Sequence, residues 1–162
     1  MRIYIPATHL DLDSEGVSPR IVHAVTPELP REIDLNGVPD SEVCEILEAV
    51  AMNAAADDSL RLLRLRAGAG VSVAPYRIVI VADIDDVYVA RCGDSGQLVT
   101  ARETTAPVAW ADVCAIHVDD SEACALIERA MGGDDEAFER SYEEDLMWHD
   151  VLERTALRAR FA

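Results

Sequence analysis

The chain has 162 residues, with 31 acidic residues against 14 basic ones, and its formal net charge is −17 at pH 7. All the basic residues are arginines, and the isoelectric point is about 4.4. Phosphate binding needs clustered cations, so this charge argues against nucleic acid and against anionic membranes as partners. A chain of this length can remove about 70% of its unfolded surface from water as one domain, so we expect a single domain spanning residues 1–162.

The start of the chain and its cysteines bear on localisation. Residues 2–5 predict a short strand that ends at Pro6, without the basic region and the apolar run of about 7–15 residues that mark a signal peptide. No segment approaches the roughly 20 apolar residues of a transmembrane helix. The cysteines, at positions 44, 92, 114 and 124, form no CxxC pair and are expected to be free, mostly buried thiols. We therefore expect a cytoplasmic protein.

A second strand, a loop and a long helix are expected next. Residues 21–25 predict the strand, and residues 27–40 have the proline and glycine content of a loop. The helix is expected over about residues 41–66, with Asp40 or Ser41 as its N-cap. Its apolar residues recur at helical spacing and predict one buried stripe: Val43, Ile46, Leu47, Val50, Ala51 and Ala54.

The middle of the chain predicts strands. Residues 78–82 form a continuous β-branched run, which is typical of a strand covered on both faces in a parallel sheet. Residues 87–89 and 97–100 predict a hairpin around a glycine-rich turn at 93–96. Residues 113–118 predict a further short strand.

Two helices are expected at the C-terminal end. The first is capped by Asp120 or Ser121. The second is expected over residues 141–160, with acidic residues near its start and arginines near its end, as the helix dipole favours. Trp148 belongs to its apolar face and is expected to be packed, although Trp148 or Trp110 could instead anchor a partner surface.

The order of these elements favours an α/β fold. We expect one domain with a mixed, mostly parallel sheet of about five to six short strands, a long helix and two C-terminal helices.

Several short segments form a pattern along the chain. They are MRIYIPAT at residues 1–8, HAVTP at 23–27, VADID at 81–85, AIHVDD at 115–120 and EDLMWH at 144–149. Together they resemble one family of short acidic actinobacterial proteins of unknown function, in which a tyrosine follows the tail tryptophan where this chain has His149. The resemblance spans nearly the whole chain. It implies an intact single-domain cytoplasmic protein and gives no catalytic residue to carry over.

Polar side chains follow each expected core strand. Asp83 and Asp85 come after the 78–82 strand, and Asp119 and Asp120 come after the 113–118 strand. If these strands are parallel, the carboxylates meet at one edge of the sheet, where open α/β sheets bind ligands. Carboxylate oxygens are the ligands that Mg²⁺ and other hard divalent cations prefer. The sequence therefore allows a metal site at these four residues, against the simpler interpretation that strand ends meet water and that Asp120 caps a helix.

Two histidines are candidate accessory residues. His9 follows the first strand, at the edge expected to hold the metal. His117 lies in an apolar strand two residues before Asp119, on the same strand face, and such a pair could act as a general base. A lone strand histidine is more often a hydrogen-bonded structural residue.

Two functions remain open. The first is a cytoplasmic protein-binding or self-associating module without catalytic activity or cofactor, with a protein partner or a homo-oligomer as its complex. The alternative is a small divalent-metal-dependent enzyme of the hydrolase or phosphoryl-transfer type, in which the cation activates water or clamps a phosphate at the strand-end carboxylates. Convergence of several carboxylate or imidazole groups in one cleft would distinguish them.

Overall fold

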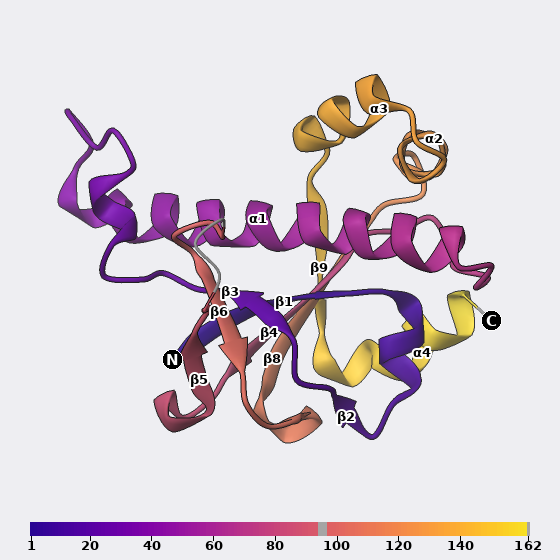
Figure 1. Ribbon diagram of the computed structural model, residues 1–162, viewed down its shortest axis with the longest axis horizontal. Helices are drawn as coiled ribbons and strands as arrows, with labels where there is room; N and C mark the ends of the chain where they lie inside the picture. Colours follow the sequence, from indigo (N-terminus) through magenta and orange to yellow (C-terminus); the bar gives the residue numbers. More distant parts are fainter. Residues whose placement is uncertain (94–96, 162) are drawn as a thin grey trace.

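The computed structural model describes residues 1–93 and 97–161 and shows a long helix lying across a seven-stranded sheet (Figure 1). The sheet strands are β1 (Arg2–Ala7), β3 (Ile21–His23), β4 (Ile78–Asp83), β5 (Val89–Arg91), β6 (Ala101–Thr104), β8 (Val113–Asp119) and β9 (Leu146–Asp150). A separate ladder pairs β2 (Gly16–Val17) with β7 (Val108–Ala109). The helices are α1 (Asp40–Gly68), α2 (Cys124–Met131), α3 (Asp135–Arg140) and α4 (Arg154–Arg160).

Neighbouring strands in the large sheet are antiparallel, in the order β5-β6-β3-β1-β4-β8-β9. The α/β class is confirmed, but the expected mostly parallel sheet is wrong. The apolar runs of β1, β4 and β8 misled the prediction because these strands are covered on both faces. Burial on both faces removes the alternation that usually marks an antiparallel strand, and strand direction leaves no other trace in such a run.

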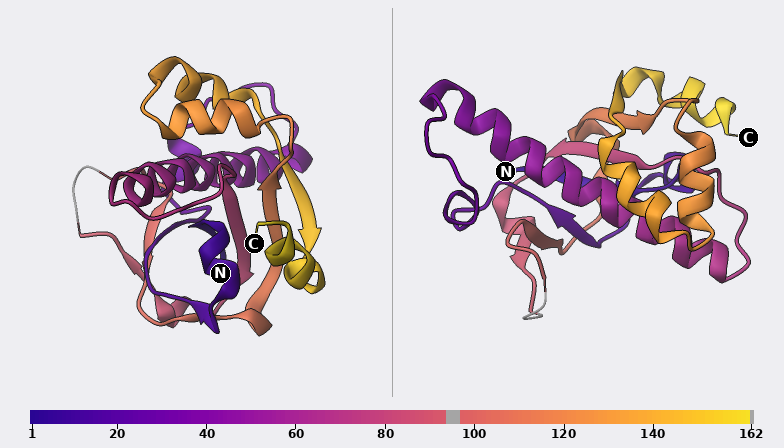
Figure 2. Two further views of the ribbon diagram at one scale, coloured as in Figure 1. Left: turned by 90° about the vertical axis from the view of Figure 1, so that its right-hand side faces the viewer. Right: turned by 90° about the horizontal axis from the view of Figure 1, so that it is seen from above.

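The central strands send alternate side chains into two packed layers. Ile5 and Ile80 point into a core that includes residues of α4 and of the β2–β7 ladder. Tyr4 and Val81 point the other way, toward Ala51 and its neighbours on α1. Helices α2 and α3 lie on the far side of α1 from the sheet (Figures 1 and 2). The sheet is therefore sandwiched between α1 and a thinner layer built around α4.

Helix α1 confirms the expected long helix and extends it to 29 residues, or roughly 44 Å at 1.5 Å per residue. Leu47, Ala51 and Ala54 of the expected stripe are buried, whereas Val43 and Ile46 at the start of the helix are only half-buried. The small alanines let the middle of α1 approach the sheet closely. A cleft lies between the first half of the helix and the sheet.

The C-terminal region differs from the single helix expected over residues 141–160. Residues 146–150 form β9, which pairs with β8, and α4 begins only at Arg154. Pairing with the open side of β8 overrides the helical spacing of the apolar residues here, because propensity is weaker than a full strand ladder. The helix expected after Asp120 is confirmed as α2.

The expected hairpin is present but shifted along the chain. Strand β5 pairs with β6, so the second strand begins at Ala101 rather than at residue 97. Residues 94–96 of the expected turn lie outside the described residues.

Candidate functional site

The strand-end carboxylates do not share one edge of the sheet. Asp83 ends β4 and pairs with Arg2 at the start of β1, with 2.9 Å between Nη2 and Oδ2. Asp119 ends β8, which runs antiparallel to β4, and its carboxylate is fully buried against Arg77 at the start of β4. Antiparallel pairing therefore places Asp83 and Asp119 at opposite ends of the sheet.

The two remaining candidate ligands act as caps. Asp85 accepts a hydrogen bond from the backbone N–H of Val87 at 3.1 Å. Asp120 accepts from the backbone N–H groups of Glu122 and Ala123, at 2.6 and 3.0 Å. Across residues 1–93 and 97–161, no three His, Cys, Asp or Glu side chains come together in a way that could hold a metal ion.

His9 lies away from all four carboxylates. Its Nδ1 accepts a hydrogen bond from the backbone N–H of Ala74 at 3.2 Å, and its ring packs 5.9 Å from that of Phe161. Burial lowers the pKa of His9. His9 therefore has a structural role, because its uncharged ring accepts a backbone hydrogen bond.

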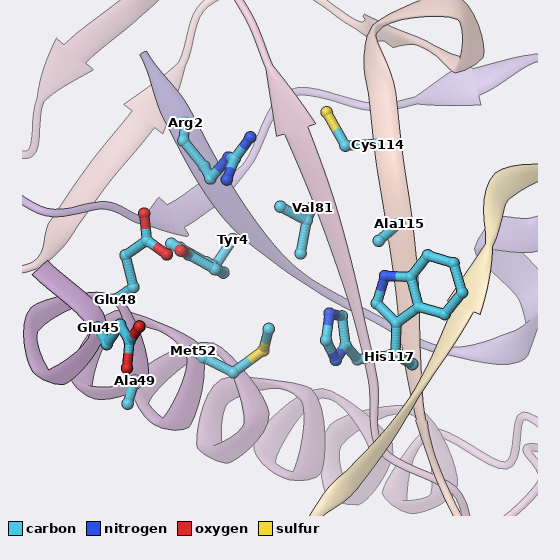
Figure 3. A pocket seen from close by; sticks show the side chains of 11 residues that line it. Arg2, Tyr4, Glu45, Glu48, Ala49, Met52, Val81, Cys114, Ala115 and His117 are labelled. Atoms are coloured by element: carbon cyan, nitrogen blue, oxygen red, sulfur yellow. The ribbon is translucent and has the colours of Figure 1, made fainter. Parts of the chain in front are cut away.

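His117, by contrast, lines a cleft between the first half of α1 and the sheet (Figure 3). The cleft encloses about 410 Å³ and continues into a second hollow of about 210 Å³ that shares Ala49, Met52 and His117. Ligand sites commonly enclose about 300–1,000 Å³. The cleft is therefore of suitable size for a ligand, and it contains a residue singled out from the sequence.

The cleft walls combine aromatic and acidic groups. Tyr4 comes from β1, Glu45 and Glu48 come from α1, and Trp148 comes from β9. Burial and the nearby Glu48 carboxylate raise the pKa of Tyr4 to about 12, so its hydroxyl stays protonated. Arg2 is paired with Asp83, so the two carboxylates of Glu45 and Glu48 leave the cleft with more negative than positive charge.

The carboxylate expected to pair with His117 is engaged elsewhere. Burial lowers the pKa of His117, so its ring is uncharged at neutral pH. Asp119 shares its strand face, but both carboxylate oxygens of Asp119 accept hydrogen bonds from Arg77. The expected general-base pair therefore lacks a free carboxylate, and His117 acts as a wall of the cleft.

Strand β9, which forms one side of the cleft, is also the last strand of the sheet, and no strand among the described residues pairs with its outer side. Trp148 is 59% exposed and Met147 is 52% exposed, so the expected packing of Trp148 is wrong. The alternative, that Trp148 anchors a partner surface, stays a prediction. Trp148 sits directly across from His117 in the β8–β9 ladder. An exposed aromatic residue on an edge strand is unusual because such edges are normally protected.

Sequence reasoning found His117 and Trp148 but missed the α1 wall. Glu45, Glu48, Ala49 and Met52 recur at helical spacing, which was a readable signal of one shared face. The prediction for this helix followed only its apolar stripe, to which Glu45 and Glu48 do not belong. The cysteine expectation also fails in part, since Cys44 and Cys114 are exposed, although all four thiols are free.

Comparisons with known proteins extend the sequence resemblance without adding an activity. No curated protein and no solved structure matches the chain. No helix among the described residues has the length and apolar character needed to cross a membrane. The model of a family of unknown function (DUF6912) matches residues 1–157. The chain belongs to this family.

Proposed function

We propose that the protein is a cytoplasmic protein-binding module that takes an extended basic segment of its partner along β9. The observation that carries the proposal is the open edge strand with Trp148 exposed at its centre. Strand addition at an open edge is a common mode of peptide recognition, with backbone hydrogen bonds for affinity and side-chain pockets for specificity.

The backbone of β9 has hydrogen-bonding groups directed outward. The N–H of Asp119 donates to the carbonyl oxygen of Arg77, just before β4. In β8 the backbone N–H and C=O groups of Asp119 and His117 therefore point toward β4. The backbone groups of Val118 and Ile116 point toward β9, where they face Met147 and His149. The N–H and C=O of Trp148 therefore face away from β8, where an added strand would meet them.

The charge around β9 favours a basic partner. Glu144 and Asp145 precede the strand, Asp150 ends it, and Glu45 and Glu48 line the cleft beside it. Arginine or lysine side chains of an added strand could reach these carboxylates and the face of Trp148, where cation–π attraction adds to the contact. A second copy of the chain would bring like charges together. We therefore favour a basic partner over a homo-oligomer.

The cytoplasmic part of the proposal is supported by the four free cysteines, since thiols persist in reducing compartments. The strand-end carboxylates carry no second proposal, because Asp85, Asp119 and Asp120 are engaged by hydrogen bonds within the protein.

Peptide binding tests the proposal directly. A Trp110→Phe background leaves Trp148 as the single tryptophan, whose fluorescence can be followed while a short peptide of alternating arginine and valine is added. We expect saturable binding that falls with salt, and no binding of the same peptide with glutamate in place of arginine. Methylation of alternate backbone nitrogens should abolish binding because it removes the strand hydrogen bonds. Binding that survives this methylation would contradict strand addition.

Light scattering tests the alternative occupant. We expect a monomer across the concentration range used for the peptide titration. A dimer that dissociates on the change Trp148→Glu would instead identify a second copy of the chain as the natural occupant of β9.

A further inference from the structure

Another cavity, separate from the cleft beside β9, lies between the second half of α1 and the chain at the end of β1 and the start of β3. It encloses about 530 Å³, and Arg20, Arg61 and Arg66 are among its walls. In a chain with a net charge of −17, a hollow bordered by three of the 14 basic residues needs an explanation.

One end of this cavity carries more positive than negative charge. The carboxylate of Asp11 accepts a hydrogen bond from Arg20 at 2.7 Å and lies 3.4 Å from Nη2 of Arg66. The backbone N–H of Thr8 donates to the same carboxylate at 2.8 Å. Burial works against ionisation of Asp11, but these hydrogen bonds and the two arginines hold its pKa below the usual value. One carboxylate thus faces two guanidinium groups, and one positive charge is left over.

The other end of the cavity is electrically balanced. Asp58 accepts from Arg61 at 2.6 Å through Oδ1 and lies 3.0 Å from Nε2 of His23 through Oδ2. Both of its oxygens are therefore occupied from within the protein. The uncompensated charge belongs to the end formed by Arg20 and Arg66.

The surface between the two ends is apolar. Leu62 and Leu65 lie on α1, and Ile21, Pro6 and Pro19 lie on the opposite wall. Leu65 is 70% exposed. Asp58, Leu62, Leu65 and Arg66 follow helical spacing and form one face of α1, so the charged groups and the leucines open onto the same hollow.

We propose that this cavity binds a small organic monocarboxylate with an apolar tail. The carboxylate is placed at the end formed by Arg20 and Arg66, because its negative charge complements the one positive charge left over there. The tail lies along Leu62 and Leu65. The volume is within the range of about 300–1,000 Å³ for small-molecule sites. At physiological salt, charges further than about 8 Å away are screened, so the local arginines outweigh the distant acids.

Octanoate is a suitable probe, with octylamine and 1-octanol as probes of the same length and different head groups. Backbone amide shifts in NMR spectra of the full-length protein report where each probe binds. We expect saturable octanoate-induced shifts at Ile21, Leu62 and Leu65, weaker octanoate binding at higher salt, and no saturable shifts with octylamine. Equal affinity for 1-octanol and octanoate would overturn the proposal, since the arginines would then contribute nothing.

Two matched variants locate the site. Leu65→Asp and Leu152→Asp each replace an exposed leucine by the same acid, at 70% and 87% exposure, and so change the net charge equally. We expect octanoate binding to weaken at least tenfold in Leu65→Asp and to stay within twofold of the original in Leu152→Asp. Equal effects, or no effect in either variant, would overturn the proposal. Because Leu65 is exposed, loss of folding does not confuse the result, and the peptide titration at β9 should be unaffected by Leu65→Asp.

Discussion

Arg77 and Asp119 form a buried bidentate ion pair that ties the start of β4 to the end of β8. The shortest contact, Nη2 to Oδ1, is 2.6 Å, and the two side chains are 2% and 0% exposed. Arg77 also donates to the carbonyl oxygens of Ser141 and Glu144, at 2.7 and 2.9 Å. One side chain therefore holds the segment that leads into β9 against the sheet.

Removing one partner of this pair should destabilise the protein strongly. We expect Asp119→Asn to lower the free energy of unfolding by about 3–5 kcal/mol, because a buried guanidinium group is left uncompensated. Urea denaturation measures the change. The exposed pair of Arg2 and Asp83 is the control, and Asp83→Asn should cost no more than about 1 kcal/mol. Equal losses in the two variants would contradict a special role for the buried pair.

His117 should make stability depend on pH just below neutrality. Burial lowers its pKa in the folded state relative to about 6.5 in the unfolded chain. The unfolded chain therefore binds the proton more readily, and stability is lost as the pH falls from about 6.5 to the lower folded pKa. We expect His117→Gln to remove this part of the decline. Melting temperatures of both proteins between pH 5 and pH 8 should converge or cross as the pH falls, and parallel curves would contradict the prediction.

The two tryptophans should differ in what they contribute to stability. Trp110 donates its indole N–H to the carbonyl of Ser14 at 2.9 Å, and the guanidinium carbon of Arg154 lies 3.9 Å from its ring centroid. We expect Trp110→Ala to cost roughly 2–3 kcal/mol. In urea denaturation, Trp148→Ala should cost no more than about 0.5 kcal/mol because its ring is largely exposed, and it should abolish peptide binding in calorimetric titration, which needs no tryptophan as a probe. A large stability loss at Trp148 would place it in the core instead.

Cys114 should become more reactive when its acidic neighbour is neutralised. Partial burial and the Asp83 carboxylate, 3.3 Å from the sulfur, raise the pKa of the Cys114 thiol. The thiolate is the species that alkylates, so Asp83→Asn should speed labelling of Cys114 by iodoacetamide several-fold at pH 8. Mass spectrometry of timed samples resolves Cys114 from the other thiols. Asp112→Asn is the control, since only the backbone carbonyl of Asp112 approaches the sulfur.

How much could be predicted from the sequence depended on what each pattern encodes. The α1 stripe and the β4 run were readable because burial repeats at the period of the element. The direction of β4 relative to β8 could not be predicted, because an apolar run covered on both faces has the same composition in a parallel and in an antiparallel sheet. The metal hypothesis at Asp83 and Asp119 depended on that direction and lost its geometric basis with it.

The misreading of residues 146–150 has a different cause. The spacing of Met147, Trp148 and Val151 fits a helix as well as a strand, and only the open side of β8 decides between them. Conversely, Trp148 could not be recognised as exposed until that strand was placed at the edge. The cavity at Arg20 and Arg66 was also beyond sequence reasoning, because its walls come from segments 46 residues apart.

The open edge of β9 also has a consequence for handling the protein. An exposed edge strand that carries Met147 and Trp148 can pair with the edge strand of another molecule and start aggregation. The acidic residues beside it oppose this association because the molecules repel each other. The net charge of the protein, and with it the repulsion between molecules, falls toward zero as the solution approaches the isoelectric point of about 4.4. Acidified, concentrated samples should therefore turn cloudy while the fold is still intact, and they should clear again when the pH is restored.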